Sequence, residues 1–422
     1  MKNKMQSTRG QDIASIDEAI RLGLARDGGL FVPTHFPNLS IKKFYEYGSF
    51  KEFCKQLMAP FFTHSQIDIN DEFTQKVFNF PLPLHSLGKQ SYALELFHGP
   101  TLSFKDLGAQ FFSECLSILS AGQKTKVLVA TSGDTGGAIA QALHGKNPIE
   151  GIILFPKDKI TASQQAQITC WGDNIRALAV NGSFDQCQSL VKESFSKQNV
   201  GEALTTANSI NIARLLPQMI FYAYSSIRIA IMNNCSVNYI VPSGNLGNVT
   251  ACYWAKYLGF PIQRILIANN ANHVLSDFLK RGFFKAKPSI STLANAMDVG
   301  DPSNLERLLS LFTSFEDCKK HMDVESVNDQ QIKNAIISCF KQYHYLICPH
   351  TATAFHRLST MDLTGAWVIV ATAHPAKFTE VIEPLINTTV QIPASLKNML
   401  SQKQHYSIIE PNYQSLSHYL KN

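Results

Sequence analysis

The sequence lacks long apolar runs and paired cysteines. No stretch of about eighteen uncharged apolar residues occurs, and the N-terminus MKNKMQSTRGQD has no apolar core that a signal peptide would need. The nine cysteines are scattered, without a CxxC pair, as expected for reduced and mostly buried thiols. These absences predict a cytoplasmic protein without a membrane partner.

Charge is also sparse. Charged residues make up 17% of the 422 residues, and the 38 basic ones are dispersed, leaving a net charge of +6. Dispersed basic charge fits small anionic metabolites better than nucleic acid. The GxGxxG fingerprint of dinucleotide sites and the GK[ST] of a Walker loop are both absent. His350 and His374 have no third partner at metal-ligand spacing, so no metal is assigned.

Two patterns divide the chain. Residues 1–90 lack a strand–turn–helix rhythm and contain amphipathic helices within 16–33 and at about 50–58, which predicts a capping domain. From residue 91, apolar strands alternate with glycine turns and helices, which is typical of parallel, doubly wound α/β sheets. The clearest of these strands are 92–97, 126–130, 151–156, 237–242 and 366–371. Residues 313–333 are predicted to be an exposed insertion and 396–422 a polar tail.

One lysine stands at a predicted strand-to-helix corner. In HGPTLSFKDLGAQFF (98–112), a Gly-Pro break ends an apolar strand and a helical pattern follows, with Lys105 at its start. The positive end of the helix dipole and burial beside Phe104 both disfavour an ammonium, so the pKa of Lys105 should fall. A neutral amine suits Schiff-base chemistry with pyridoxal 5'-phosphate (PLP). The alternative is a solvated lysine without a catalytic role.

Two glycine turns feed helices after strands. SGNLGN (243–248) and TSGDTGG (131–137) would expose backbone N–H groups at helix N-termini, where phosphates and carboxylates bind. Either turn alone is equally consistent with an ordinary connection between strand and helix. Together they suggest a site for a cofactor phosphate and another for a substrate carboxylate.

Further donors lie downstream. NSINIARLLPQ (208–218) presents Ser209, Asn211 and Arg214, and a helix would put the last two on one face, as suits a second phosphate or simply a capped surface helix. Thr372 follows an apolar strand, where such sheets display ligands, and its hydroxyl could face a pyridine nitrogen or cap a helix.

Taken together, these stretches closely resemble the threonine synthase family, which consists of PLP enzymes of the tryptophan-synthase-β-like fold (fold type II). The likeness spans nearly the whole chain, and the motifs that carry it, in order, are STRG with GLARDGGLFVP, HGPTLSFKDLGAQF, TSGDTGGAIA, NSINIARLLPQ, VPSGNLGN, AMDVGDPSNLERLL, PHTATA and TAHPAKF. It implies an α/β fold with doubly wound sheets in a large and a small domain, plus the N-terminal capping domain. In this division, residues 91–422 form the catalytic region, with a mobile small domain at about 113–204.

The resemblance also implies the site residues. Lys105 would be the Schiff-base lysine. The residues implied around the cofactor are Gly244, Asn245, Leu246, Gly247 and Asn248 at its phosphate and Thr372 at its pyridine nitrogen. The residues implied around the substrate are Ser132, Asp134 and Thr135 near its carboxylate and Ser209, Asn211 and Arg214 at its phosphate. Three positions depart from the family pattern: Cys348, His273 and Leu246.

The implied reaction converts O-phospho-L-homoserine and water to L-threonine and phosphate. The nearest alternative is a threonine-synthase-like phospholyase or a dehydratase-type lyase, which releases a keto acid. A non-catalytic metabolite-binding relative would be favoured by loss of Lys105, which is present. A nicotinamide dehydrogenase lacks support because its fingerprint is absent. The chain is expected to act as a monomer or a homodimer.

Overall fold

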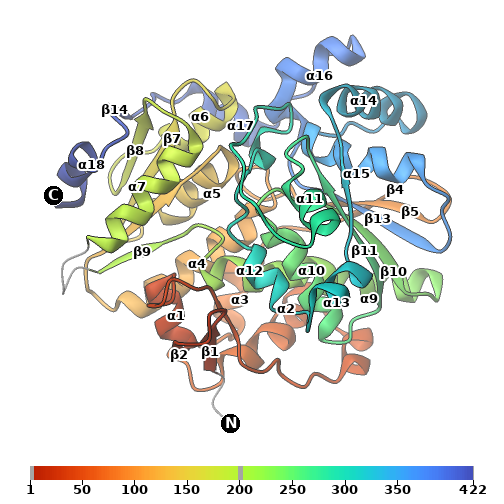
Figure 1. Cartoon of the computed structure of the whole chain (residues 1–422), viewed down its shortest axis with the longest axis horizontal. Helices are drawn as coiled ribbons and strands as arrows, with labels where there is room; N and C mark the ends of the chain where they lie inside the picture. Colours follow the sequence, from red (N-terminus) through yellow and green to blue (C-terminus); the bar gives the residue numbers. More distant parts are fainter. Residues whose placement is uncertain (1–3, 198–202, 422) are drawn as a thin grey trace.

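Two β-sheets and an N-terminal region make up the computed structural model, which describes residues 4–197 and 203–421. Figure 1 shows one sheet on the left, the other on the right, and the N-terminal residues below them.

The N-terminal region combines a small antiparallel sheet with three helices. Its strands, in the order β2-β1-β3, are β1 (Lys4–Ser7), β2 (Ile13–Ser15) and β3 (Phe31–Pro33). Its helices are α1 (Ile16–Leu22), α2 (Phe50–Met58) and α3 (Asp71–Val77). The first two confirm the predicted helices. A capping box between Ser15 and Glu18 starts α1, and Gly23, at a φ of 73°, ends it.

The larger sheet has six strands in the order β12-β11-β10-β13-β5-β4. They are β4 (Leu84–Ser86), β5 (Ser91–Glu95), β10 (Val237–Pro242), β11 (Ile262–Asn269), β12 (Asp323–Ser326) and β13 (Ala366–Ala371). All neighbours pair in parallel except β4, which is antiparallel to β5. The predicted insertion at 313–333 is wrong, because β12 pairs with β11 inside this sheet.

The smaller sheet has five parallel strands in the order β14-β8-β7-β6-β9. They are β6 (Thr125–Ala130), β7 (Ile149–Pro156), β8 (Ile175–Val180), β9 (Leu204–Thr206) and β14 (Ser407–Ile409). The predicted polar tail at 396–422 is wrong, because β14 pairs with β8 and the final helix α18 (Tyr413–Lys421) packs on α7 (Phe184–Ser196). Ile409 and Leu416 are buried in an apolar core formed with the smaller sheet, which explains why the C-terminal segment packs there.

Helices cover the two sheets. Besides α7, those between residues 105 and 233 are α4 (Lys105–Ser120), α5 (Asp134–Leu143), α6 (Ala162–Thr169), α8 (Ile212–Leu215) and α9 (Met219–Asn233). Those between residues 247 and 401 are α10 (Gly247–Tyr257), α11 (Val274–Arg281), α12 (Leu305–Leu309), α13 (Phe315–His321), α14 (Asp329–Tyr343), α15 (Pro349–Thr360), α16 (Thr379–Ile386) and α17 (Ala394–Ser401). The stretch Ile212–Asn233 is apolar and long enough to span a membrane by length and composition, but 72% of its most apolar window is buried inside the protein, as in a core helix.

One apolar core joins the N-terminal region to both sheets. Phe53 of α2, Phe111 of α4, Ile220 of α9 and Val127 of β6 all belong to it. All nine cysteines are free thiols, and seven of them are buried. The division into a capping domain, a catalytic region and a mobile small domain stays a prediction.

Candidate active site

The Lys105 corner is tied to the end of β13. The N–H of Phe104 donates to the carbonyl of Thr372 at 2.9 Å, and the N–H of His374 donates to the carbonyl of Leu102 at 3.0 Å. Lys105 begins α4 directly after this bridge. The backbone therefore fixes the lysine and Thr372 on neighbouring segments, at the carboxyl edge of the larger sheet.

Asp106 holds the loop before the lysine. Its carboxylate accepts the N–H of Thr101 at 3.0 Å and the N–H of Ser103 at 3.4 Å, and it also accepts the Thr101 hydroxyl. Burial raises the pKa of Asp106 to about 6, against the opposing effect of these hydrogen bonds and of Lys377. Asp106 thus stabilises the backbone of the loop before Lys105 and does not line the cavity.

Lys105 has the lowered pKa that the sequence predicted. Burial is the main cause, the Arg214 and Lys377 cations add to it, and Asp134 opposes it, giving a pKa of about 8. The ring of Phe104 lies 5.6 Å from Nζ. At such a pKa about a tenth of the side chain is a free amine at pH 7, far more than for a lysine at its ordinary pKa.

The SGNLGN turn joins β10 to α10. Leu246 adopts a φ of 61° just before the helix, and Gly247 begins it. A Cβ on Gly244 would lie 2.6 Å from the Cα of Met297, so only glycine fits there. The turn therefore presents backbone N–H groups at the positive end of an 11-residue helix.

On the opposite wall, the TSGDTGG turn starts α5. Ser132, Asp134 and Thr135 all line the cavity. The Asp134 carboxylate accepts Lys377 Nζ at 2.7 Å and Gln164 Nε2 at 3.0 Å. Lys377, fully buried, holds the pKa of Asp134 well below its usual range, although burial alone would raise it. Both partners contact Oδ1, and a carboxylate only accepts hydrogen bonds, so the donors that this turn offers to an anionic ligand are its hydroxyls and first-turn N–H groups.

A third cluster of donors surrounds α8. Arg214 is 2% exposed, its Nη1 donates to the carbonyl of Ala207, and its Nε has no partner within the described residues. Burial lowers the pKa of Arg214 to about 10, so the guanidinium remains a cation at neutral pH. The unpaired Nε–H of this buried cation is therefore available to donate a hydrogen bond to a bound anion.

The structure does not bring Asn211 into this cavity. Its Oδ1 accepts the N–H of Ala213, and its Nδ2 donates to the carbonyls of Ile20 and Thr206. All of its side-chain hydrogen-bonding groups are thus used in capping α8 and fastening it to α1. Asn211 therefore lies outside the cavity and acts by fixing the position of α8.

His350 lines the cavity although no functional role was predicted for it. Its Nε2 accepts the N–H of Ala296 at 3.1 Å, so the proton of the neutral ring is on Nδ1. Burial lowers its pKa to about 4, with Asp134 opposing and the Lys105 and Lys377 cations adding. The imidazole is therefore uncharged at neutral pH and anchors the loop that carries Met297.

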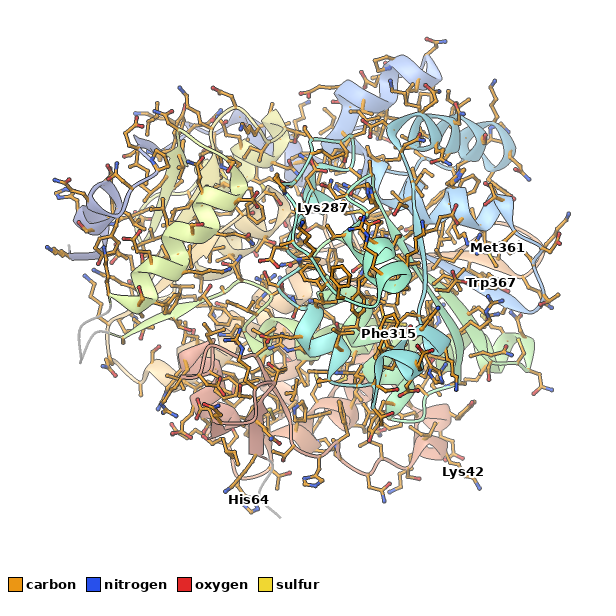
Figure 2. All side chains as sticks on the ribbon, in the orientation of Figure 1. Lys42, His64, Lys287, Phe315, Met361 and Trp367 are labelled. Carbon is orange, nitrogen blue, oxygen red and sulfur yellow. The ribbon has the colours of Figure 1, made fainter. Side chains whose placement is uncertain are left out.

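The three departures from the family pattern have different consequences. The Cys348 thiol caps α15 by accepting the N–H of Thr351 at 3.5 Å, which is the work an aspartate would do. His273 lies outside the cavity, and its Nε2 is 3.4 Å from the Nζ of Lys287. The Lys287 side chain is labelled in Figure 2. Leu246 alone lines the cavity, so it is the departure nearest to bound molecules.

Apart from Asn211, every site residue that the sequence proposed lines one cavity. These residues are Lys105, Ser132, Asp134, Thr135, Ser209, Arg214, Gly244, Asn245, Leu246, Gly247, Asn248 and Thr372. Among the further polar residues that line the cavity and were not proposed from the sequence are Thr131, Asn208, Gln218, Ser243 and His350. No group of three or more histidine, cysteine or carboxylate side chains able to hold a metal occurs within the described residues.

The cavity fits PLP. The Lys105 amine lies in the same cavity as a glycine turn at a helix start, and that turn keeps its shape only with glycine at 244, where a Cβ would lie 2.6 Å from the Cα of Met297. The buried hydroxyl of Ser243 in that turn has no hydrogen-bond partner within residues 4–197 and 203–421. The Thr372 hydroxyl offers a neutral partner for a ring nitrogen.

Comparison with known proteins agrees with this geometry. Residues 75–372 match the family described as "Pyridoxal-phosphate dependent enzyme", residues 4–77 match "Threonine synthase N terminus", and residues 351–419 match "Threonine synthase, C-terminal". The class defined by the fold and the cavity is that of PLP-dependent enzymes of fold type II.

The relatives narrow this class. The chain is 37% identical over 394 residues to the threonine synthase of Haemophilus influenzae, covering 92% of each chain. Its structure resembles the crystal structure of threonine synthase from Escherichia coli with a TM-score of 0.93 and 32% identity, over 99% of both chains. It also resembles the PLP-bound threonine synthase of Brucella melitensis, with a TM-score of 0.90 and 30% identity over 99% of both chains. The chain belongs to the threonine synthase family and is a PLP-dependent lyase.

Proposed function

We propose that the protein converts O-phospho-L-homoserine and water to L-threonine and phosphate, and that the cavity residues act as follows. The observation that carries this proposal is the placement of Lys105, with its lowered pKa, in one cavity with a backbone anion site and with a buried arginine. A phosphorylated amino acid and a phosphorylated cofactor need two such anion sites. When bound, PLP supplies an electron sink that acidifies the α-proton of the amino acid.

Lys105 holds the cofactor and moves the α-proton. Once released, its Nζ is a neutral amine that accepts the proton from the α-carbon and returns it to that carbon after water has added at the β-carbon. Between these two transfers the β-carbon loses a proton as the γ-phosphate departs, and the γ-carbon gains one. Thr372 presents its hydroxyl to the pyridine nitrogen, and the SGNLGN turn binds the cofactor phosphate through N–H groups.

Arg214 and Ser209 receive the substrate phosphate. The free Nε of Arg214 points to an anion as its partner, and the buried cation stabilises the negative charge that grows as the γ-phosphate departs. Ser132 and Thr135 bind the substrate carboxylate through hydroxyl and N–H donors. Asp134 takes part through its backbone N–H, because its carboxylate, whose Oδ1 accepts from Lys377 and Gln164, would repel the carboxylate of the substrate.

The segment 113–204, of which 198–202 lie outside the described residues, closes over the substrate. Besides the shared apolar core, polar contacts join its described part to the segment between α11 and α12, among them Asn295 with Gln164 at 3.1 Å and Ser289 with Asp185 at 3.4 Å. Such contacts exchange with water more readily than an apolar core does, and closure would exclude water from reactive species. We expect slower proteolysis of this segment with a substrate analogue bound; equal rates would contradict closure.

The protein is expected to act in the cytoplasm, where its nine free thiols stay reduced, as a monomer or a homodimer. Sedimentation at two protein concentrations would separate these two assembly states.

The deciding experiment incubates the purified, PLP-loaded protein with O-phospho-L-homoserine and quantifies phosphate, threonine and 2-oxobutyrate together. Equal amounts of phosphate and threonine are expected. Phosphate accompanied by the keto acid would identify a phospholyase instead, and absence of phosphate release would overturn the proposal.

A further inference from the structure

The hydroxyl of Ser209 has both of its acceptor positions occupied. Asn304 Nδ2 donates to Ser209 Oγ at 2.9 Å, and Asn245 Nδ2 donates to it at 3.2 Å. A serine hydroxyl has two lone pairs and one proton. With both lone pairs taken, the proton occupies the remaining direction around the oxygen.

Neither amide can turn round to accept that proton. Asn304 Oδ1 accepts Arg307 Nη1 at 2.6 Å, and a guanidinium only donates. Asn245 Oδ1 accepts the backbone N–H of Ser303, also at 2.6 Å. Each oxygen is held by a donor that cannot change its role, so each Nδ2 must face Ser209.

Arg307 makes this arrangement rigid. It is fully buried, and its guanidinium donates to the carbonyls of Phe31 at 3.0 Å, Ser209 at 3.1 Å and Ile210 at 2.7 Å. No carboxylate lies within ion-pair distance of it in the described residues. The side chain thus ties β3, the turn before α8 and α12 together.

We propose that Asn304, held in place by Arg307, acts with Asn245 to direct the Ser209 O–H into the cavity as a fixed donor to a phosphate monoester. Ser209 lines the cavity, and its proton has no acceptor among residues 4–197 and 203–421. An ionised phosphate, which accepts hydrogen bonds, would be the acceptor for the Ser209 proton. Asn304 and Arg307 are positioning residues in this scheme.

Two phosphates have this chemistry, that of the cofactor and that of the substrate. Assignment to the substrate rests on the proposed function, because it requires a phosphorylated amino acid. A fixed donor also favours an ionised phosphate over the unphosphorylated alcohol, because a charged oxygen accepts a hydrogen bond more strongly than a neutral hydroxyl oxygen does.

The test exchanges one donor for an acceptor. Asn304→Asp keeps an oxygen toward Arg307 and replaces Nδ2 by a second oxygen, which would accept the Ser209 proton and turn it away from the cavity. Two measurements test whether Ser209 binds the substrate phosphate. They are calorimetry with inorganic phosphate on the PLP-loaded protein and the KM for O-phospho-L-homoserine. Titration of the apoprotein with PLP tests whether Ser209 binds the cofactor phosphate instead.

We expect the Kd for phosphate and the KM to rise about tenfold or more, with cofactor affinity unchanged. Weakening of PLP binding instead would support the oriented donor and assign it to the cofactor phosphate. No change in either arm would overturn the proposal. Asn304→Ala, which frees one lone pair, is the second variant if Asn304→Asp fails to fold, and it should give a smaller rise.

A double-mutant cycle separates orientation from simple charge repulsion. In a Ser209→Ala background, Asn304→Asp should cause no further loss, because no hydroxyl is left to turn. A further loss as large as in the wild type would mean that the new carboxylate repels phosphate, which overturns the proposal. Glu306→Gln, a neighbouring α12 change whose side chain pairs with Arg9 on the surface, is the matched control and should leave binding unchanged.

Failure of this inference differs from failure of the proposed function. If the wild type makes threonine while Asn304 variants bind phosphate normally, only the orienting role is lost. If the wild type makes no threonine but Asn304→Asp still weakens phosphate binding, the oriented donor stands without the reaction.

Discussion

The two proposed phosphate sites of the cavity are built in different ways. The SGNLGN site uses backbone N–H groups at the start of α10, with glycine where Met297 leaves no room for a Cβ. The site around Arg214 uses side chains, which are held by segments far apart in the sequence. A backbone site needs a local turn, whereas a side-chain site needs a tertiary network, so the two should respond differently to substitution.

The largest expected effect is a loss of turnover that leaves both sites intact. Lys105→Ala removes the amine that lies between them and should lower the rate of phosphate release roughly a thousandfold or more. Calorimetry should still detect phosphate binding, since Arg214 and the SGNLGN turn remain. A variant with near-normal turnover would contradict the role of Lys105.

The second prediction breaks the side-chain site. Arg214→Ala should raise the KM for O-phospho-L-homoserine roughly tenfold to a hundredfold, because a charged hydrogen-bond donor to the phosphate is lost. Cofactor affinity should change little, as the backbone site is untouched. Thermal melting serves as the control for folding, and unchanged kinetics in a folded variant would refute the assignment.

The third prediction breaks the backbone site. Gly244→Ala places a Cβ 2.6 Å from the Cα of Met297 and should weaken PLP binding about tenfold by displacing the turn. The matched control is Gly172→Ala, where a Cβ would meet nothing within 4 Å. If both variants bind PLP equally well, the turn is not the cofactor cradle.

The smallest effect concerns pH. Because the folded apoprotein holds the pKa of Lys105 at about 8, below its ordinary value, the neutral fraction rises as pH passes through that value and levels off above it. The rate of PLP capture by the apoprotein should therefore rise about tenfold between pH 7 and 9 and then reach a plateau. A rise continuing past pH 10 would indicate an unperturbed lysine.

Local sequence predicted one of the two sites better than the other. The strand–turn–helix pattern around SGNLGN and the corner at Lys105 were readable because neighbours along the chain make them. Asn211 was placed at a phosphate from its spacing to Arg214, but its amide caps α8. Helical spacing shows which residues share a face of a helix. It does not show whether backbone groups nearby already use the hydrogen-bonding atoms of those side chains.

Lys377, Asn304 and Arg307 carried no local signal of their roles. Lys377 reaches Asp134 across 243 positions of sequence, the difference between 377 and 134. The C-terminal strand β14 was likewise missed, because a short segment joins a sheet only when β8 offers an edge for it.

By itself, the sequence determined the alternating strands and helices, the glycine turns and the lysine at its corner, because dihedral preference and apolar period act over a few residues. Only the tertiary structure decided which buried groups meet. It paired Asp134 with Lys377, left the Nε of Arg214 without a partner among the described residues, and turned two amides toward Ser209. A buried polar group must find a partner wherever the fold supplies one, and that partner is set by packing across the whole chain.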